Sequence, residues 1–265
     1  MIATFPTISK PPKSPLRSYP EKLKVSRSIN EVVQSGKKRE LSFSIKEGKQ
    51  DYVVTGEQNS HTNIFLTGSG TKNQFSHVRI HGILQKDASM HFIAGFTGGA
   101  RVEVETWFEL CKPGSNVKVS GAFLGTKEQH HGFHIVIDHV APSTNADILL
   151  RGVYRDQSRG IFTGLLKVGK NAQQTNSYFT DNVLLMNEAL AESIPSLEIL
   201  ANDVKASHGS TTGRINDEQL FYLMSRGLSK QKATKMITDG FLQKVIDRLP
   251  SQYHSTIQSI LYDKS

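Results

Sequence analysis

Short apolar runs bounded by turn residues fill the chain between residues 39 and 212. The runs are LSFSI, DYVVTG, TNIFLTG, SHVRIHGIL, MHFIAGFT, RVEVETWF, NVKVSGAFLG, FHIVIDHVAP, DILLRGVY and GIFTGLLKV. Some of them alternate between apolar and polar residues, as at Val102 and Val104, whereas residues 148–150 are continuously apolar. Because Gly, Asn, Asp, Ser or Pro separates the runs, the pattern predicts a mostly β protein built from short strands.

The lack of a helical period between these runs limits the architecture. A doubly wound parallel sheet is excluded, because crossover helices join the strands of that fold. A sandwich, a barrel and a β-solenoid all stay open on the pattern alone. The turns favour the solenoid, since few are hairpin signals of the Asn-Gly or Asp-Gly type, although the sequence has no repeat of fixed length.

A helical pattern replaces the strands from Asn216 onward. Asn216 is a good N-cap and Gly227 a good stop for a first helix, while Ser229 and Pro250 bound a second. A third short apolar stripe follows at residues 257–261. Burying six apolar side chains of these helices would contribute about 10 kcal/mol before the entropy loss is included, so we expect the helices to dock on a surface.

Residues 1–38 have the composition of a basic, largely disordered tail, rich in proline and serine and without an acidic residue before Glu21. A short helix is expected from Ser28 to Gln34. The tail lacks the continuous apolar core of a secretory signal, and an organellar transit peptide stays open as an alternative. The predicted division is therefore a tail at 1–38, a β core at 39–212 and a helical region at 213–265.

Composition narrows the class of protein. No run approaches the roughly 20 apolar residues that cross a bilayer, and a single cysteine, Cys111, excludes an internal disulfide framework and fits a reducing compartment. We therefore expect a soluble, cytoplasmic protein. The net charge of +8 would suit a nucleic-acid partner, but the charge is spread along the chain and no aromatic stacking motif accompanies it.

Three motifs that suggest chemistry have simpler explanations. Gly164 to Asn171 resembles a phosphate-binding loop, but Asn171 stands where a hydroxyl must hold magnesium, and LLKV favours a strand, so we expect no bound ATP. Cys111 precedes Lys112, which could lower the pKa of the thiol, yet a partly packed structural thiol is the commoner case.

Four histidines form the third motif. These are His130, His131, His134 and His139, and strand alternation would put His130 and His134 on one face. A cupin-like metal site is one interpretation. Because no carboxylate follows at a suitable spacing, surface histidines near a turn are favoured instead.

His208 is the candidate site residue. In LEILANDVKASH the residues alternate, so Val204, Ala206 and His208 are predicted to share one side of a strand. Gly209 follows at once and has no side chain to cover the imidazole. On the residues alone, a solvated or packed histidine is the commoner outcome.

A family resemblance favours a functional role for His208. The stretch from about Ile148 to Gly240 resembles the SufB/SufD family of iron-sulfur cluster assembly proteins, and its SufD branch more than SufB. The residues that carry the resemblance are RGVYRDQSRGIFTGLLKVGKNAQQTN and LLMNEALAESIPSLEILANDVKASHGSTTGRINDEQLFYLMSRGLS. It implies a right-handed parallel β-helix, a β-solenoid, with a C-terminal α-helical region.

The resemblance also implies a function. The chain would be a non-enzymatic scaffold subunit that binds a SufC-like ABC ATPase through Phe221, Tyr222, Arg226 and Gly227. Its β-helix would pair with a SufB-like chain or with an identical chain. His208 falls on the SufD histidine proposed as a ligand of a transient iron-sulfur cluster or of iron, and ligation needs neutral imidazole, so binding should weaken below about pH 6.

Several positions depart from the family pattern. Gly209 stands where SufB-like chains carry a glutamate, which favours the SufD branch. Ala206 occupies a position that is often cysteine in SufD, and Asp181 lies near the sulfur-accepting cysteine of SufB, so this chain is not expected to receive sulfur there. Cys111 matches no family site, and the N-terminal helical region usual in SufD looks shortened to a tail. A β-helix carbohydrate-active enzyme and a basic nucleic-acid binder stay as alternatives.

Overall fold

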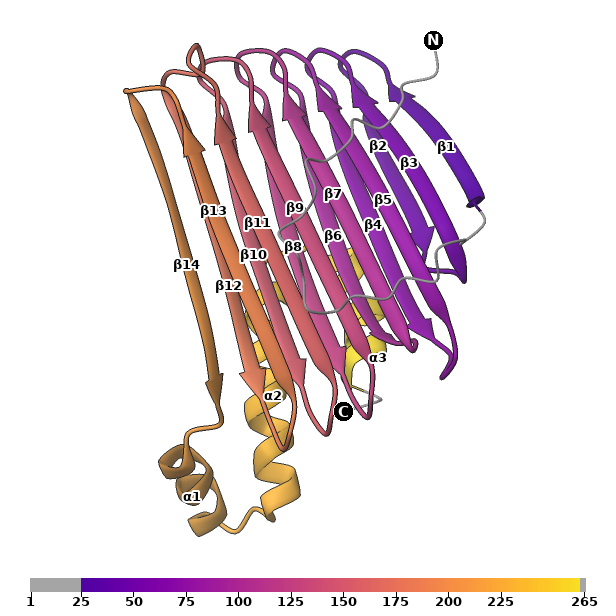
Figure 1. Cartoon of the computed structure of the whole chain (residues 1–265), viewed down its shortest axis with the longest axis vertical. Coiled ribbons are helices and arrows are strands. Elements are labelled where there is room, and N and C mark those ends of the chain that lie inside the picture. The colour runs from indigo at the N-terminus through magenta and orange to yellow at the C-terminus, as the bar shows by residue number, and fades with distance from the viewer. Residues whose placement is uncertain (1–24, 263–265) are drawn as a thin grey trace.

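Strands make up most of residues 25–262, the part of the chain that the structure, a computed structural model, describes. The chain passes back and forth between two seven-stranded sheets, and each strand pairs in parallel with strands of its own sheet. Figure 1 shows the two sheets as layers that run the length of the molecule, with helices behind one of them. The fold is thus a parallel β-solenoid of about six turns with three C-terminal helices, which confirms the predicted fold class.

The odd-numbered strands form one sheet, called sheet A here, and the even-numbered strands form the other, sheet B. Sheet A contains β1 (Val25–Val33), β3 (Gly48–Gly56), β5 (Phe75–Leu84), β7 (Arg101–Leu110), β9 (His130–His139), β11 (Arg159–Val168) and β13 (Leu190–Ile199). Sheet B contains β2 (Lys38–Ser44), β4 (His61–Gly70), β6 (Ser89–Gly98), β8 (Asn116–Gly125), β10 (Asn145–Tyr154), β12 (Thr175–Leu185) and β14 (Val204–Arg214).

The length of a solenoid turn drifts along the chain. Gly48 pairs with Ser76, a spacing of 28 residues, and Arg101 pairs with His130, a spacing of 29. Near the C-terminal end Arg159 pairs with Leu190, a spacing of 31. This drift explains why the sequence shows no repeat of fixed length although the architecture is repetitive.

The turns between the sheets use left-handed residues without hairpin chemistry. Asn59, Asp87, Lys127, Asp156 and Asn187 have φ between 54° and 61°, a region that Asn and Asp tolerate better than most residues. Successive turns hydrogen-bond to one another, since the Asn59 amide donates to the Lys86 carbonyl and the Asp87 amide to that of Pro113. These turns join strands of different sheets, which is why Asn-Gly hairpin signals are scarce.

Large side chains fill the space between the two sheets. The centroid of the Phe133 ring lies 6.3 Å from that of Phe92 and 5.1 Å from that of Phe123. Both distances are typical of favourable aromatic contacts. Gly164 makes room for such a ring, because a Cβ there would lie 2.6 Å from the Phe179 ring. Glycine in the strand GIFTGLLKV therefore serves packing between the sheets.

The three helices are α1 (Asp217–Ser225), α2 (Lys230–Ile246) and α3 (His254–Tyr262), and the 3-10 helix η1 (Ser251–Tyr253) precedes α3. The predicted caps are confirmed, because the side chains of Asn216 and Ser229 each accept a hydrogen bond from a backbone amide three residues later. Pro250 lies between α2 and α3, as expected. None of the helices in residues 25–262 has the length and apolar character of a membrane span.

The helices α2 and α3 dock on the outer face of sheet B. The contact joins buried apolar side chains of the two helices, Leu242, Val245, Ile246, Ile257 and Leu261, with those of the sheet, Phe65, Ile93, Ala122, Leu124, Val153 and Leu184. Polar anchors surround this contact: Arg151 donates to the Phe241 carbonyl at 2.8 Å, and Arg248 pairs with Asp147 at 2.6 Å. The expectation that the helical region needs a surface is confirmed.

The predicted helix from Ser28 to Gln34 is wrong. The segment forms β1, which pairs with β3 so that Ile29 lies opposite Tyr52 and Val32 opposite Thr55. The apolar spacing at residues 29, 32 and 33 suits either structure, and the exposed edge of β3 supplies the hydrogen-bond partners that a strand needs. Residues 25–38, which the sequence assigned to the tail at 1–38, therefore include strand β1 of the solenoid, and residues 1–24 lie outside the described part.

Candidate functional site

The C-terminal end of the solenoid is an open edge. Within residues 25–262, β13 pairs only with β11, and β14 pairs only with β12. Apolar side chains at this end are exposed: Leu190 by 53%, Leu197 by 39%, Ile199 by 38% and Leu200 by 60%. Unpaired strand edges with exposed apolar residues are a typical surface for association with another chain.

His208 lies on this edge, near the middle of β14. The register places Val204, Ala206 and His208 opposite Thr175, Ser177 and Phe179 of β12. Those three β12 residues are buried between the sheets, so His208 belongs to the inward face of the last strand. The imidazole is nonetheless exposed, because no further turn of the described chain stacks on β14.

Asp181 lies one strand deeper on the same inward face. Its side chain has no exposed surface, and Ser210 of β14, directly opposite, donates a hydrogen bond to Oδ2 at 3.0 Å. Burial raises the pKa of this carboxyl, an effect that Ser193, Ser210 and His208 oppose. The family resemblance singled out Asp181 only because it lacks a thiol, although alternation with Phe179 and Val183 predicts an inward side chain.

The predicted ATPase-binding residues lie on and just after α1. Phe221 is 72% exposed and Tyr222 is 56% exposed, and α1 has no buried residue. The Arg226 guanidinium lies 5.2 Å from the centre of the Tyr222 ring, and Gly227 ends the helix with φ of 89°. In Figure 1 α1 follows β14 beyond the end of the solenoid and lies beside one end of α2.

The prediction of surface histidines near a turn is wrong for two of the four. His131 and His139 point between the sheets and are 2% and 0% exposed. His131 Nε2 donates to the Gly98 carbonyl, while the His139 ring bonds the hydroxyls of Thr144 and Ser177. Burial lowers the pKa of each imidazole to about 4.

His130 and His134 do share the outer face of sheet A, as alternation predicted. The carboxylate that the sequence near these histidines lacks comes from β7, because His134 Nε2 lies 3.0 Å from Glu103 Oε2. Glu103 also accepts a hydrogen bond from Arg101 Nε at 2.8 Å. Its pKa is lowered because His134 and Arg101 together outweigh the opposing effect of burial. No group of three potential ligands converges to hold a metal within the described residues.

Other carboxylates on the outer face of sheet A are also paired. Glu105 lies 3.1 Å from His77 Nε2, and Glu109 lies 2.7 Å from His81 Nε2. A carbohydrate-active enzyme would need carboxylates available to a substrate. The pairing of this face therefore gives that alternative no support.

Cys111 is a partly buried thiol, and the segment that begins at Gly164 is part of a strand, as the sequence favoured. Burial, followed by Glu109 and Asp138, raises the pKa of the Cys111 thiol to about 11, and Lys112 opposes this only weakly. Residues 164–168 lie inside β11, where no open phosphate cradle forms.

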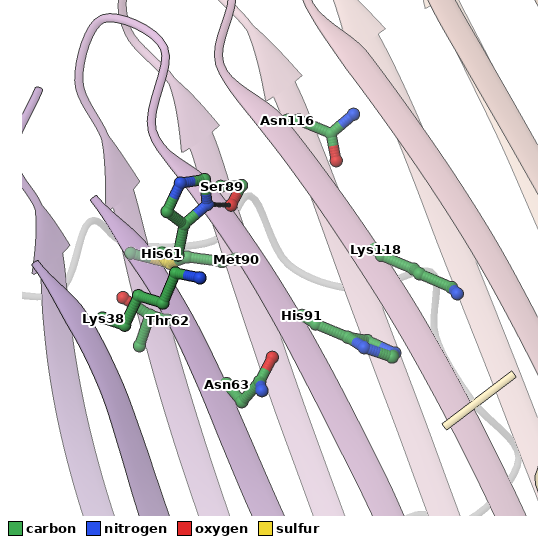
Figure 2. Close-up of a pocket in the computed structure, with 9 residues that line it drawn as sticks. All are labelled: Lys38, His61, Thr62, Asn63, Ser89, Met90, His91, Asn116 and Lys118. Carbon is green, nitrogen blue, oxygen red and sulfur yellow. Dashed lines mark hydrogen bonds between the residues drawn. The ribbon is translucent and has the colours of Figure 1, made fainter. Parts of the chain in front are cut away.

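A hollow lies on the outer face of sheet B, away from the open edge (Figure 2). It is lined by Lys38, His61, Thr62, Asn63, Ser89, Met90, His91, Asn116 and Lys118. His61 bonds the Ser89 hydroxyl at 2.7 Å, and burial together with Lys118 and Arg248 lowers the pKa of His91 to about 3. None of the predicted site residues lines this hollow.

Comparisons with known proteins identify the family of this chain. Residues 50–241 match the family model for the SUF system FeS cluster assembly SufBD core domain. The chain is 34% identical to the iron-sulfur cluster assembly protein SufD of Escherichia coli over 181 residues, which cover 67% of this chain and 43% of that protein. It is 31% identical to SufD of Bacillus subtilis over 166 residues, 62% of this chain and 38% of that protein. SufB of Bacillus subtilis is 28% identical over 182 residues, 68% of this chain and 39% of SufB. The chain thus spans less than half the length of these relatives.

Proposed function

Because this chain belongs to the SufBD family of iron-sulfur cluster assembly proteins, we propose that it is a non-enzymatic scaffold subunit of a SUF-type assembly complex. The observation that carries the proposal is the open edge of β13 and β14 with an exposed imidazole at its centre. A strand edge supplies backbone hydrogen bonds to a mating chain, and His208 supplies a ligand at the seam that mating would create.

Pairing through the open edge of β13 and β14 would account for the exposed apolar residues there. Leu197 and Ile199 lie on the face of β13 that would point inward if another turn followed. A SufB-like chain, or a second copy of this chain, would cover them and continue the stack of parallel strands. Association would also bury Leu200, the most exposed apolar residue of this end.

The helix α1 is the proposed contact for a SufC-like ABC ATPase. Its aromatic residues Phe221 and Tyr222 are exposed, and Arg226 lies beside them. Aromatic and arginine side chains are those that most often dominate protein interfaces. Because α1 follows directly after β14, movement of α1 by a nucleotide-driven partner would act on the strand that holds His208.

His208 would be a ligand of a transient cluster or of iron. Thiolates are the usual cluster ligands, and an imidazole in the set changes potential and solvation. A scaffold must release its cluster, so a ligand other than thiolate suits the role.

Co-expression with a SufC-like ATPase and a SufB-like chain tests the proposal. The three chains are expected to co-purify, and His208→Ala should leave the subunits together while lowering their iron and sulfide content several-fold. A chain that elutes alone in the presence of both partners would contradict the scaffold role. Full cluster content in His208→Ala would remove the imidazole from it.

A further inference from the structure

We propose that the hollow on the outer face of sheet B is a binding site for a phosphate group, either free phosphate or the phosphate of a small polar molecule. The hollow has a volume of about 390 Å³ and lies away from the open edge of β13 and β14. Residues of the four neighbouring strands β2, β4, β6 and β8 form it (Figure 2). The site is therefore separate from the surfaces through which this chain would join its partners.

Strand register arranges the polar side chains of the hollow in two rows across sheet B. The first row contains Lys38, His61, Ser89 and Asn116, and the second, two residues further along each strand, contains Asn63, His91 and Lys118. Between the rows, Thr62 and Met90 are buried, so the residues of both rows belong to the outer face. Every side chain of the two rows can donate a hydrogen bond, which is what an oxyanion requires.

Two lysines give the hollow a positive charge. Lys38 and Lys118 lie on opposite sides of it in Figure 2, and none of the described residues that line it is acidic. Glu40 lies opposite Asn63 on the neighbouring strand, but its carboxylate accepts a hydrogen bond from Asn63 at 2.8 Å. Two cations and one carboxylate leave an excess of positive charge, and a bound anion would reduce it.

The segment after α2 holds Lys118 in position. The ammonium donates to the Arg248 carbonyl at 3.1 Å, and because a lysine has three N–H donors, two stay available. Burial, followed by Arg248, lowers the pKa of Lys118, although Asp147, which pairs with Arg248 at 2.6 Å, acts in the opposite direction. The charge of Lys118 is thus partly desolvated and incompletely compensated. A cation fixed in this way loses less freedom on binding an anion than a mobile surface lysine does.

His91 supplies a neutral donor directly opposite Lys118 in the register. Burial, followed by Lys118 and Arg248, lowers the pKa of the imidazole to about 3, so the ring is uncharged at neutral pH. The Ser120 hydroxyl lies 3.0 Å from Nε2 and can donate to it, which leaves the Nδ1–H for a ligand. A phosphate in the hollow would therefore meet a charged and a neutral N–H group on adjacent strands.

The lining selects the class of anion. Amide and hydroxyl groups surround the lysines, and none of the described lining residues has a phenyl or indole ring. A nucleobase would find no stacking platform there. Phosphate offers more acceptor oxygens than a carboxylate, and lysine is a common phosphate ligand. These features favour phosphate, or the phosphate ester of a small polar molecule, over a nucleotide.

Calorimetric titration of the full chain with inorganic phosphate, at neutral pH and low chloride, tests the site. Lys118→Gln removes the charge but keeps a polar side chain, and it should weaken phosphate binding about fivefold or more. Lys38→Gln should weaken binding about threefold or more, because its charge acts from the other side of the hollow. Lys72→Gln, at an exposed position in the turn between β4 and β5, is the control and should stay within about 1.5-fold of the wild type.

Glycerol phosphate as a second probe distinguishes the two sources of the phosphate group. Binding tighter than that of inorganic phosphate would support the ester of a polar molecule, whereas equal or weaker binding would support free phosphate. In both cases Lys118→Gln should weaken the binding of the two probes by a similar factor, since both would use the same N–H donors.

Absence of phosphate binding, or equal losses in Lys118→Gln and Lys72→Gln, would overturn the proposal, because equal losses indicate attraction to the basic chain as a whole. If Lys118→Gln did not fold, Lys38→Gln would decide, since that side chain is exposed and its replacement should leave the fold intact. The NMR signals of the imidazoles give an independent readout. Phosphate should shift those of His91 and leave those of His139, which lies between the sheets, unchanged; a shift of His139 with none at His91 would also overturn the site.

Discussion

Acid should destabilise the folded chain through His131 and His139, the two imidazoles that lie between the sheets. His131 donates through Nε2 to the Gly98 carbonyl, and its Nδ1 has no partner within the described residues. A second proton would therefore sit on a buried nitrogen with no acceptor. Burial lowers the pKa of both groups to about 4 in the folded chain.

The sign and size of the effect follow from linkage. An unfolded histidine has a pKa near 6.5, so between about pH 6.5 and pH 4 the unfolded chain binds more protons than the folded chain. Stability from these two groups is therefore complete above pH 6.5 and is lost as the pH falls toward 4. Each histidine contributes a slope of about 1.4 kcal/mol per pH unit in that window and a total of roughly 3 kcal/mol.

Urea unfolding at pH 7, 6 and 5, followed by the fluorescence of Trp107, measures this slope. His131→Phe places a neutral ring beside Phe96, with which the His131 ring is now in edge contact at 5.1 Å. The variant is expected to lose about 1 to 3 kcal/mol at pH 7 because the Gly98 carbonyl loses its donor, but its slope should fall by about 1.4 kcal/mol per pH unit. His61→Phe, a change at an exposed position, is the control. Equal slopes in the wild type and His131→Phe would refute the reasoning.

Three further predictions concern the helices and the open edge. Ile257→Ala removes a fully buried side chain from the contact of α3 with sheet B and should cost about 2 to 5 kcal/mol in urea unfolding; a loss below about 1 kcal/mol would mean that α3 does not hold the sheet as described. Phe221→Ala should leave the free energy of unfolding within about 0.5 kcal/mol of the wild type and weaken binding of a SufC-like ATPase at least tenfold in calorimetry, whereas Met236→Ala, at another exposed apolar position on α2, should leave binding unchanged. Ile199→Lys should abolish pairing at the C-terminal edge in light scattering, and Val32→Lys at the opposite end should not; the reverse order would place the interface at β1.

The sequence predicted correctly those helices and strands whose ends are marked by particular residues nearby in the chain. Asn216 and Ser229 mark the starts of two helices by side-chain chemistry, and the structure places the starts there, whereas α2 already ends at Ile246, before Pro250. The short strands were recognisable because Gly, Asn and Asp interrupt them. The helix expected at Ser28 to Gln34 failed because its apolar spacing fits both periods, and only the neighbouring strand β3 decides between them.

The candidate site was predicted in part. The face that holds His208 followed from alternation along β14, but its exposure depends on β14 being the last strand of its sheet in residues 25–262. The pairing of His134 with Glu103 could not be read from the chain, because the two residues are 31 positions apart and meet only when turns of drifting length stack. Asp181 was detectable as an inward residue, whereas its hydrogen bond from Ser210 depends on the pairing of β12 with β14.

Hydrogen–deuterium exchange of this chain, alone and in complex with a SufB-like chain and a SufC-like ATPase, tests the central claim most directly. The account predicts new protection in the amides of β13 and β14 from the mating chain and in those of α1 from the ATPase, with little change elsewhere. Protection confined to β1 or to the outer face of sheet A, with β14 exchanging as fast as in the isolated chain, would contradict it.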